Sequence, residues 1–216
     1  MSDATIEPSL HSDEPEGIDP GRTLALTDAV VAIAMTLLAL DLKPTLERTA
    51  STHRLAVYLG HHLGQYAAFA IAFALIAQYW MAHHQLMRGV RRASPRLMAE
   101  TLVFLFAITL MPLSTYLTGT YSNPLANSIF AGNIFLVSLT LGLTGETVHR
   151  ERLDGGTEQW SDRTARRVRS IVTLTIPTVV GVLDWVWGGH AAYLYLLFFA
   201  LDYPGRLATR RRVRAS

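Results

Sequence analysis

The chain has 216 residues, of which 50% are hydrophobic and 17% are charged, and its formal net charge is +2. Because the charges are bunched between long uncharged runs, this composition is typical of a small polytopic membrane protein. The absence of cysteine excludes disulfides, thiolate metal sites and a cysteine nucleophile.

Residues 1–21 contain six acidic side chains and neither lysine nor arginine. A secretory signal would begin with basic residues and continue into an apolar run. We therefore expect an acidic, disordered N-terminal tail and not a cleaved leader.

Residues 22–42 form the first apolar run, which is uncharged between Asp28 and Asp41. At the rise of an α-helix the run spans roughly 30 Å, the thickness of the hydrocarbon core of a bilayer, so it predicts a transmembrane helix. Asp28 would lie about one and a half turns inside this helix, where an ionised carboxylate costs several kcal/mol without a partner. It is either a structural carboxylate or the anchor of a polar network, and its partner is expected on another span.

Five more apolar runs follow. Pro112 interrupts the third span of the chain, counted from the N-terminus. The sequence thus predicts an all-α, six-span domain over residues 22–203, followed by a basic cytoplasmic tail over 204–216. The later spans are expected at 55–82, 97–117, 125–145, 170–187 and 190–202.

The arginines indicate the orientation of the spans. The loops after spans two and four and the C-terminal tail hold four, six and five arginines, whereas the loops after spans three and five hold none. The first loop, with Lys43, Arg48 and Arg54, is a partial exception. The positive-inside rule places both termini in the cytoplasm of a multi-pass protein of the inner (plasma) membrane. Since aromatic residues do not alternate with the arginines, we expect them to face the anionic lipid bilayer and not nucleic acid.

This topology brings polar residues from three spans to one depth at the cytoplasmic side. These residues are Asp28, Trp80, His83, His84 and Glu100. The pairs His61-His62 and His83-His84 are expected about 33 Å apart on one helix, too far to share a metal ion. We therefore interpret them as interfacial histidines and expect no metal site.

A stripe of apolar residues recurs at helical spacing along the first span, with Thr36 beside it. Its members are Leu26, Val30, Ile33, Leu37 and Leu40. Such a stripe is either a helix-packing face or the lining of a pore with hydrophobic constrictions, and periodicity does not separate the two. Gly60 and Gly64 form a G-x-x-x-G typical of a close helix contact. No Walker loop, nucleophile elbow or H-E-x-x-H is present, so the protein is not expected to be an enzyme.

The first span resembles the R-x-x-x-F-S-D-x-V-x-A-I-x-x-T-L-L-x-L signature of the transmembrane protein 175 family, whose bacterial members are six-helix potassium channels. The matching residues are Arg22, Leu26-Thr27-Asp28, Ala32-Ile33 and Thr36-Leu37-Leu38-Ala39-Leu40. The sequences Tyr79-Trp80-x-x-His83-His84 and Leu110-Met111-Pro112-Leu113-Ser114-Thr115 are similar to that family's second and third spans. The resemblance covers about the first 120 residues.

The resemblance implies a homotetramer in which the first span of each subunit lines a central pore that favours potassium, with no cofactor. Ile33, Leu37 and Leu40 would match the hydrophobic pore layers, and Thr36 a polar layer. The residues of the polar network behind the pore helix would be Arg22, Thr27, Asp28, Trp80 and His83, with Glu100 where the family usually has asparagine. Two neighbouring carboxylates, Asp28 and Glu100, would make this network sensitive to pH.

Two other functions remain open at this point. A proton leak or proton-coupled transporter could use Asp28, His83 and Glu100 as a relay. A non-conducting scaffold could instead bind a partner or lipid through its arginine-rich loop and tail.

Overall fold

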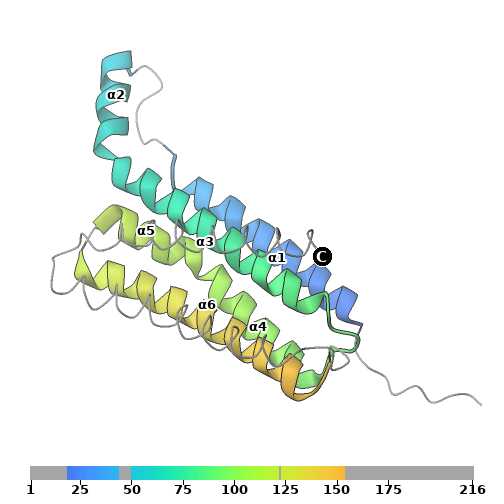
Figure 1. Cartoon of the computed structure of the whole chain (residues 1–216). Helices are drawn as coiled ribbons and strands as arrows, with labels where there is room; N and C mark the ends of the chain where they lie inside the picture. Colours follow the sequence, from blue (N-terminus) through green and yellow to red (C-terminus); the bar gives the residue numbers. More distant parts are fainter. Residues whose placement is uncertain (1–18, 44–49, 122, 154–216) are drawn as a thin grey trace, which may run out of the picture.

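The computed structural model describes residues 19–43, 50–121 and 123–153, whose regular elements are all helical. Four long segments run alongside one another as a bundle, and α2 projects from one end (Figure 1). The helices are α1 (Pro20–Leu40), α2 (Thr52–His61), α3 (Leu63–Met87), α4 (Pro95–Thr109), α5 (Met111–Tyr121) and α6 (Pro124–Arg150). The expectation of an all-α protein with several apolar helices is confirmed.

Four helical segments in the described ranges are long and apolar enough to cross a membrane. They are Pro20–Leu40, Leu63–Met87, Pro95–Tyr121 and Pro124–Arg150. The spans predicted at 170–187 and 190–202 and the tail at 204–216 lie outside the described residues, as do residues 1–18 of the acidic tail.

The second predicted span differs from the structure at its start, because His62 separates α2 from α3. The His62 ring bonds through Nδ1 to the Tyr58 carbonyl oxygen at 2.7 Å and stacks on the Tyr58 ring at 3.9 Å. These contacts end α2 one turn after Tyr58. The two histidine pairs therefore do not share one continuous helix, and α2 buries none of its residues.

The break between α4 and α5 falls at Leu110, two residues before Pro112. Proline has no backbone N–H and its ring clashes with the carbonyl one turn earlier, so a helix interior is interrupted there. This agrees with the interruption expected in the third span. The N-terminus of α4 is capped by Ser94, whose hydroxyl accepts a hydrogen bond from the Leu97 amide at 3.2 Å.

The core of the bundle lies between α1, α3, α4, α5 and α6 and is built of aliphatic and aromatic side chains. Its largest fully buried members include Phe104, Ile76, Ile108, Met111 and Ile134. Near the end that carries α2, α5 approaches α3 so closely that a Cβ atom on Gly119 would lie 3.1 Å from the Gln65 Cα. In the predicted G-x-x-x-G, a Cβ on Gly64 would meet the Gly119 carbonyl oxygen at 3.9 Å, whereas one on Gly60 would meet nothing within 4 Å.

Gly119→Ala should therefore destabilise the bundle by about 1–3 kcal/mol, because the added methyl group forces the two helix backbones apart. The measurement is the free energy of unfolding in mixed micelles. Gly132→Ala is the matched control on α6, since a Cβ there meets nothing within 4 Å. Equal effects of the two substitutions would contradict the close contact.

Candidate functional site

The first helix, α1, presents one face packed against the other described helices and one face that those helices leave uncovered. The buried residues are Thr23, Thr27, Val31, Ala34 and Leu38. On the opposite face, Ile33, Leu37 and Leu40 are 59%, 43% and 51% exposed. Leu26 is also exposed, and Val30 is partly buried. Four of the five members of the stripe identified in the sequence are therefore exposed, whereas Val30 packs against the core of the bundle.

Thr36 lies on the same uncovered face. Its hydroxyl donates a hydrogen bond to the Ile33 carbonyl oxygen at 2.7 Å. A hydroxyl has one donor and two acceptor lone pairs, so this bond uses the proton and leaves the oxygen as an acceptor. The face thus offers apolar side chains with one oxygen acceptor among them.

Asp28 finds its partner on α3, as the sequence predicts for a carboxylate within a span. The indole Nε1 of Trp80 donates a hydrogen bond to Asp28 Oδ1 at 2.7 Å. His84 Nδ1 lies 4.0 Å from the same oxygen, and its ring centroid is 5.4 Å from that of Trp80. A hydrogen bond to an ionised group contributes more than one between neutral groups, so this cluster is a strong polar link between α1 and α3.

His84 is the described histidine with a ring nitrogen within ion-pair distance of Asp28. His83 is 0% exposed, and its ring stacks on Phe104 of α4 at 4.8 Å. Neither of its ring nitrogens has a hydrogen-bond partner among the described residues. The sequence held a signal for His84 that the family resemblance did not use: Trp80 and His84 are four residues apart and so share a helix face.

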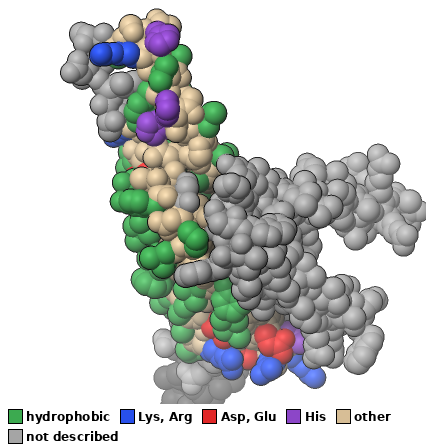
Figure 2. Space-filling view, turned by 90° about the vertical axis from the view of Figure 1, so that its left-hand side faces the viewer, with side chains coloured by type: hydrophobic (Ala, Val, Ile, Leu, Met, Phe, Trp, Pro, Cys, Tyr) green, Lys and Arg blue, Asp and Glu red, His purple; other side chains and the backbone are tan. Residues whose placement is uncertain are grey.

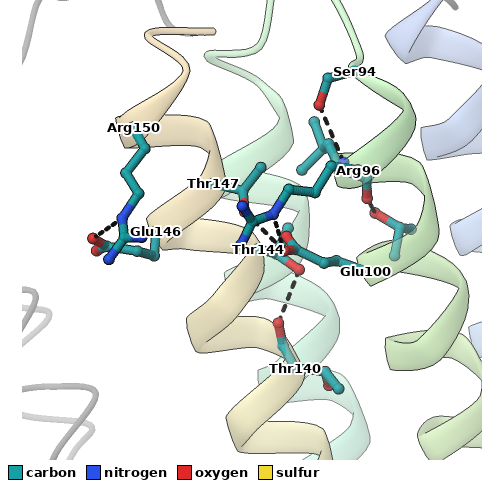
Figure 3. Close-up of polar contacts among 10 residues, drawn as sticks. Ser94, Arg96, Glu100, Thr140, Thr144, Glu146, Thr147 and Arg150 are labelled. Atoms are coloured by element: carbon teal, nitrogen blue, oxygen red, sulfur yellow. Dashed lines mark hydrogen bonds and ion pairs between the residues drawn. The ribbon is translucent and has the colours of Figure 1, made fainter.

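Glu100 links α4 to α6. Its Oε1 accepts hydrogen bonds from Thr147 Oγ1 at 2.8 Å and from Arg96 Nε at 3.0 Å, and its side chain is only 15% exposed. Figure 3 shows Arg96 and Thr147 converging on this carboxylate. Glu100 therefore has the guanidinium of Arg96 and the hydroxyl of Thr147 as neighbours. The sequence led us to expect Glu100 beside Asp28, but none of the described contacts joins these two carboxylates.

Thr27 and Arg22, the two remaining residues of the predicted network, make no described side-chain hydrogen bond or ion pair with another helix. Thr27 is buried, and its hydroxyl donates to the Thr23 carbonyl oxygen at 3.0 Å. Arg22 is exposed, and within the described ranges no hydrogen bond or ion pair joins it to another side chain. In the same ranges no group of three His, Cys, Asp or Glu side chains is placed to hold a metal ion.

Comparison with known families finds a resemblance over part of the chain. The profile of the family described as endosomal/lysosomal potassium channel TMEM175 matches residues 22–112, which include α1, α3 and α4. The resemblance expected from the sequence is confirmed.

Two relatives are named potassium channels. One, from Chamaesiphon minutus, is 27% identical over 161 residues, covering 68% of this chain and 79% of that protein. The other, from Streptomyces collinus, is 34% identical over 103 residues, covering 48% of this chain and 49% of that protein. The match thus extends over about half the length of the second relative.

Two solved structures share the fold. A lysosomal potassium-selective channel TMEM175 homolog from Chamaesiphon minutus superposes with a TM-score of 0.63 at 25% identity, over 85% of this chain and 97% of that one. A variant of the potassium channel MtTMEM175, in complex with a nanobody fusion protein, gives a TM-score of 0.60 over 90% and 96% of the two chains. At 16% identity the second likeness shows the fold alone.

A double-mutant cycle tests the contact between Asp28 and Trp80. Asp28→Asn and Trp80→Phe should couple by about 1 kcal/mol in the free energy of unfolding, because the first removes the charge that strengthens this hydrogen bond and the second removes its donor. The control pairs Asp28→Asn with Tyr79→Phe, which removes the hydrogen bond between the Tyr79 and Ser138 hydroxyls and should be additive. Additivity in both cycles would show that Trp80 does not hold Asp28.

Proposed function

We propose that this relative of the TMEM175 potassium channels is a passive, potassium-favouring cation channel. Its pore would be formed by α1 helices from the copies of a homotetramer. The observation that carries this proposal is the uncovered face of α1, where Ile33, Leu37 and Leu40 are exposed along the helix around Thr36. A fourfold arrangement of this face around an axis encloses these side chains in successive rings.

Each apolar ring is a barrier to a hydrated cation, because a narrow hydrophobic constriction loses its water. Thr36 contributes the one side-chain oxygen among these rings. Since its proton is held by the Ile33 carbonyl, four copies would direct acceptor lone pairs at the axis. Such a ring interacts favourably with a cation that has shed part of its hydration shell. Conduction by this route needs no cofactor, and K⁺ is only the permeant ion.

The polar link behind α1 supports the same function. Trp80 and His84 contact Asp28 on the side of α1 that faces α3, so they fix the helix without entering the proposed pore. The arginine distribution supports an inner-membrane orientation with both termini in the cytoplasm. The anchoring cluster then lies near the cytoplasmic end of α1.

The geometry gives less support to a proton leak or proton-coupled transport. A relay needs hydrogen-bonded neighbours, whereas the three residues considered for it have separate partners. Asp28 contacts Trp80, His83 stacks on Phe104, and Glu100 contacts Thr147. No described hydrogen bond connects one of these groups to the next.

Ile33→Asn should raise the unitary potassium conductance and lower the selectivity over sodium, because a polar ring removes one dewetting barrier. Single-channel recording in planar bilayers with ion substitution measures both quantities. Leu102→Asn is the control, since Leu102 is similarly exposed at 51% but lies on α4. Absence of potassium current from the wild-type protein, or equal effects of both substitutions, would exclude a pore along α1.

Thr36→Val should reduce the ratio of potassium to sodium permeability, because it replaces the hydroxyl by a methyl group of similar size. Thr36→Ser retains the oxygen and should keep the ratio near the wild-type value. Reversal potentials under bi-ionic conditions give the ratio. A Thr36→Val channel as selective as the wild type would show that the hydroxyl has no part in selectivity.

A further inference from the structure

The loop between α3 and α4 is held against the end of α6 by apolar anchors. Val90 and Ala93 of the loop are buried together with Leu97 at the start of α4 and Val148 near the end of α6. Arg91 and Arg92, which lie between Val90 and Ala93 in the loop, are exposed. The loop therefore presents its arginines from a fixed backbone.

The end of α6 is joined to this loop through a defined helix cap. The Leu153 amide bonds to the Val148 carbonyl oxygen at 3.0 Å, and the Arg152 amide bonds to that of His149 at 3.2 Å, which is the Schellman pattern. The Arg91 amide then bonds to the Leu153 carbonyl oxygen at 3.0 Å. Arg152 has a φ of 52°, at the cap position where glycine is usual. The helix cap itself therefore does not require an arginine side chain at this position.

Six arginines lie on the loop between α3 and α4, at the start of α4 and at the end of α6, and described acidic residues pair with two of them. Arg96 contacts Glu100 at 3.0 Å, and Arg150 contacts Glu146 at 2.8 Å (Figure 3). The other four are exposed and have no ion pair with a described residue: Arg88, Arg91, Arg92 and Arg152. Figure 2 shows charged side chains gathered at the end opposite α2. These four arginines are here called the basic platform, and among the described acidic residues only Glu151 is adjacent to one of them in sequence.

We propose that the basic platform binds the phosphate groups of anionic phospholipids in the leaflet at this end of the bundle. The platform adjoins the ends of three membrane-length segments, α3, α4 and α6, where lipid headgroups lie. Guanidinium groups form bidentate hydrogen bonds with phosphate oxygens, and an immobile loop loses little freedom on binding. This lipid site is independent of which ion, if any, crosses α1.

The test measures binding of short-chain phosphatidylglycerol to the purified full-length protein in a neutral detergent, by native mass spectrometry. Phosphatidylcholine of the same chain length and inorganic phosphate are the comparison ligands. Arg91→Gln/Arg92→Gln should weaken phosphatidylglycerol binding by about fivefold for each charge removed. Arg54→Gln is the matched control, because Arg54 is an exposed arginine on α2 at the opposite end.

A second variant separates binding from folding. Arg152→Gly removes one platform charge but places the residue that the cap geometry favours at its positive φ, so the melting temperature without lipid should stay at or above the wild-type value. Its affinity for phosphatidylglycerol should nevertheless fall. The proposal is overturned if both variants bind as the wild type does, if Arg54→Gln weakens binding equally, or if phosphatidylcholine or inorganic phosphate binds as tightly as phosphatidylglycerol.

Discussion

The hydrogen bond between the Trp80 indole and the Asp28 carboxylate determines which face of α1 is turned outward. Both faces of this helix are rich in aliphatic side chains: Val31 and Leu38 are buried, whereas Ile33 and Leu37 are exposed. In a bilayer, hydrophobicity does not distinguish these faces, because lipid tails are as apolar as a neighbouring helix. A polar contact inside the span does distinguish them, because the hydrocarbon holds no water that could bond to the donor or the acceptor if the two were separated.

Hydropathy and proline chemistry predict much of the fold from the sequence alone. Asp28 and Asp41 bracket an uncharged run within α1, and Pro112 predicts the division between α4 and α5. The division at His62 was missed, because histidine is not a helix breaker by itself and the stop depends on its particular contacts with Tyr58. Apolar runs in sequence do not reveal such local side-chain bonding.

The candidate site was predictable where it follows from helix geometry and unpredictable where it needs tertiary packing. The sequence indicates that Asp28 must be paired across spans, and Trp80 was among the expected residues. His83 and His84 point about 100° apart on one helix, and the four-residue spacing from Trp80 indicates that His84 shares the face of Trp80. The contact of Glu100 with Thr147 depends on how α4 lies against α6, and no local pattern in either helix encodes it.

The uncovered stripe on α1 also has a consequence for how subunits come together. In water such a stripe would make a lone subunit prone to aggregation, whereas in a membrane the acyl chains solvate it fully. A newly inserted subunit of the proposed tetramer would therefore not need its partners to keep this stripe out of water. Association into the proposed tetramer would then draw on close steric fit and on the release of lipids from the helix surface, so membrane composition would be part of the assembly equilibrium.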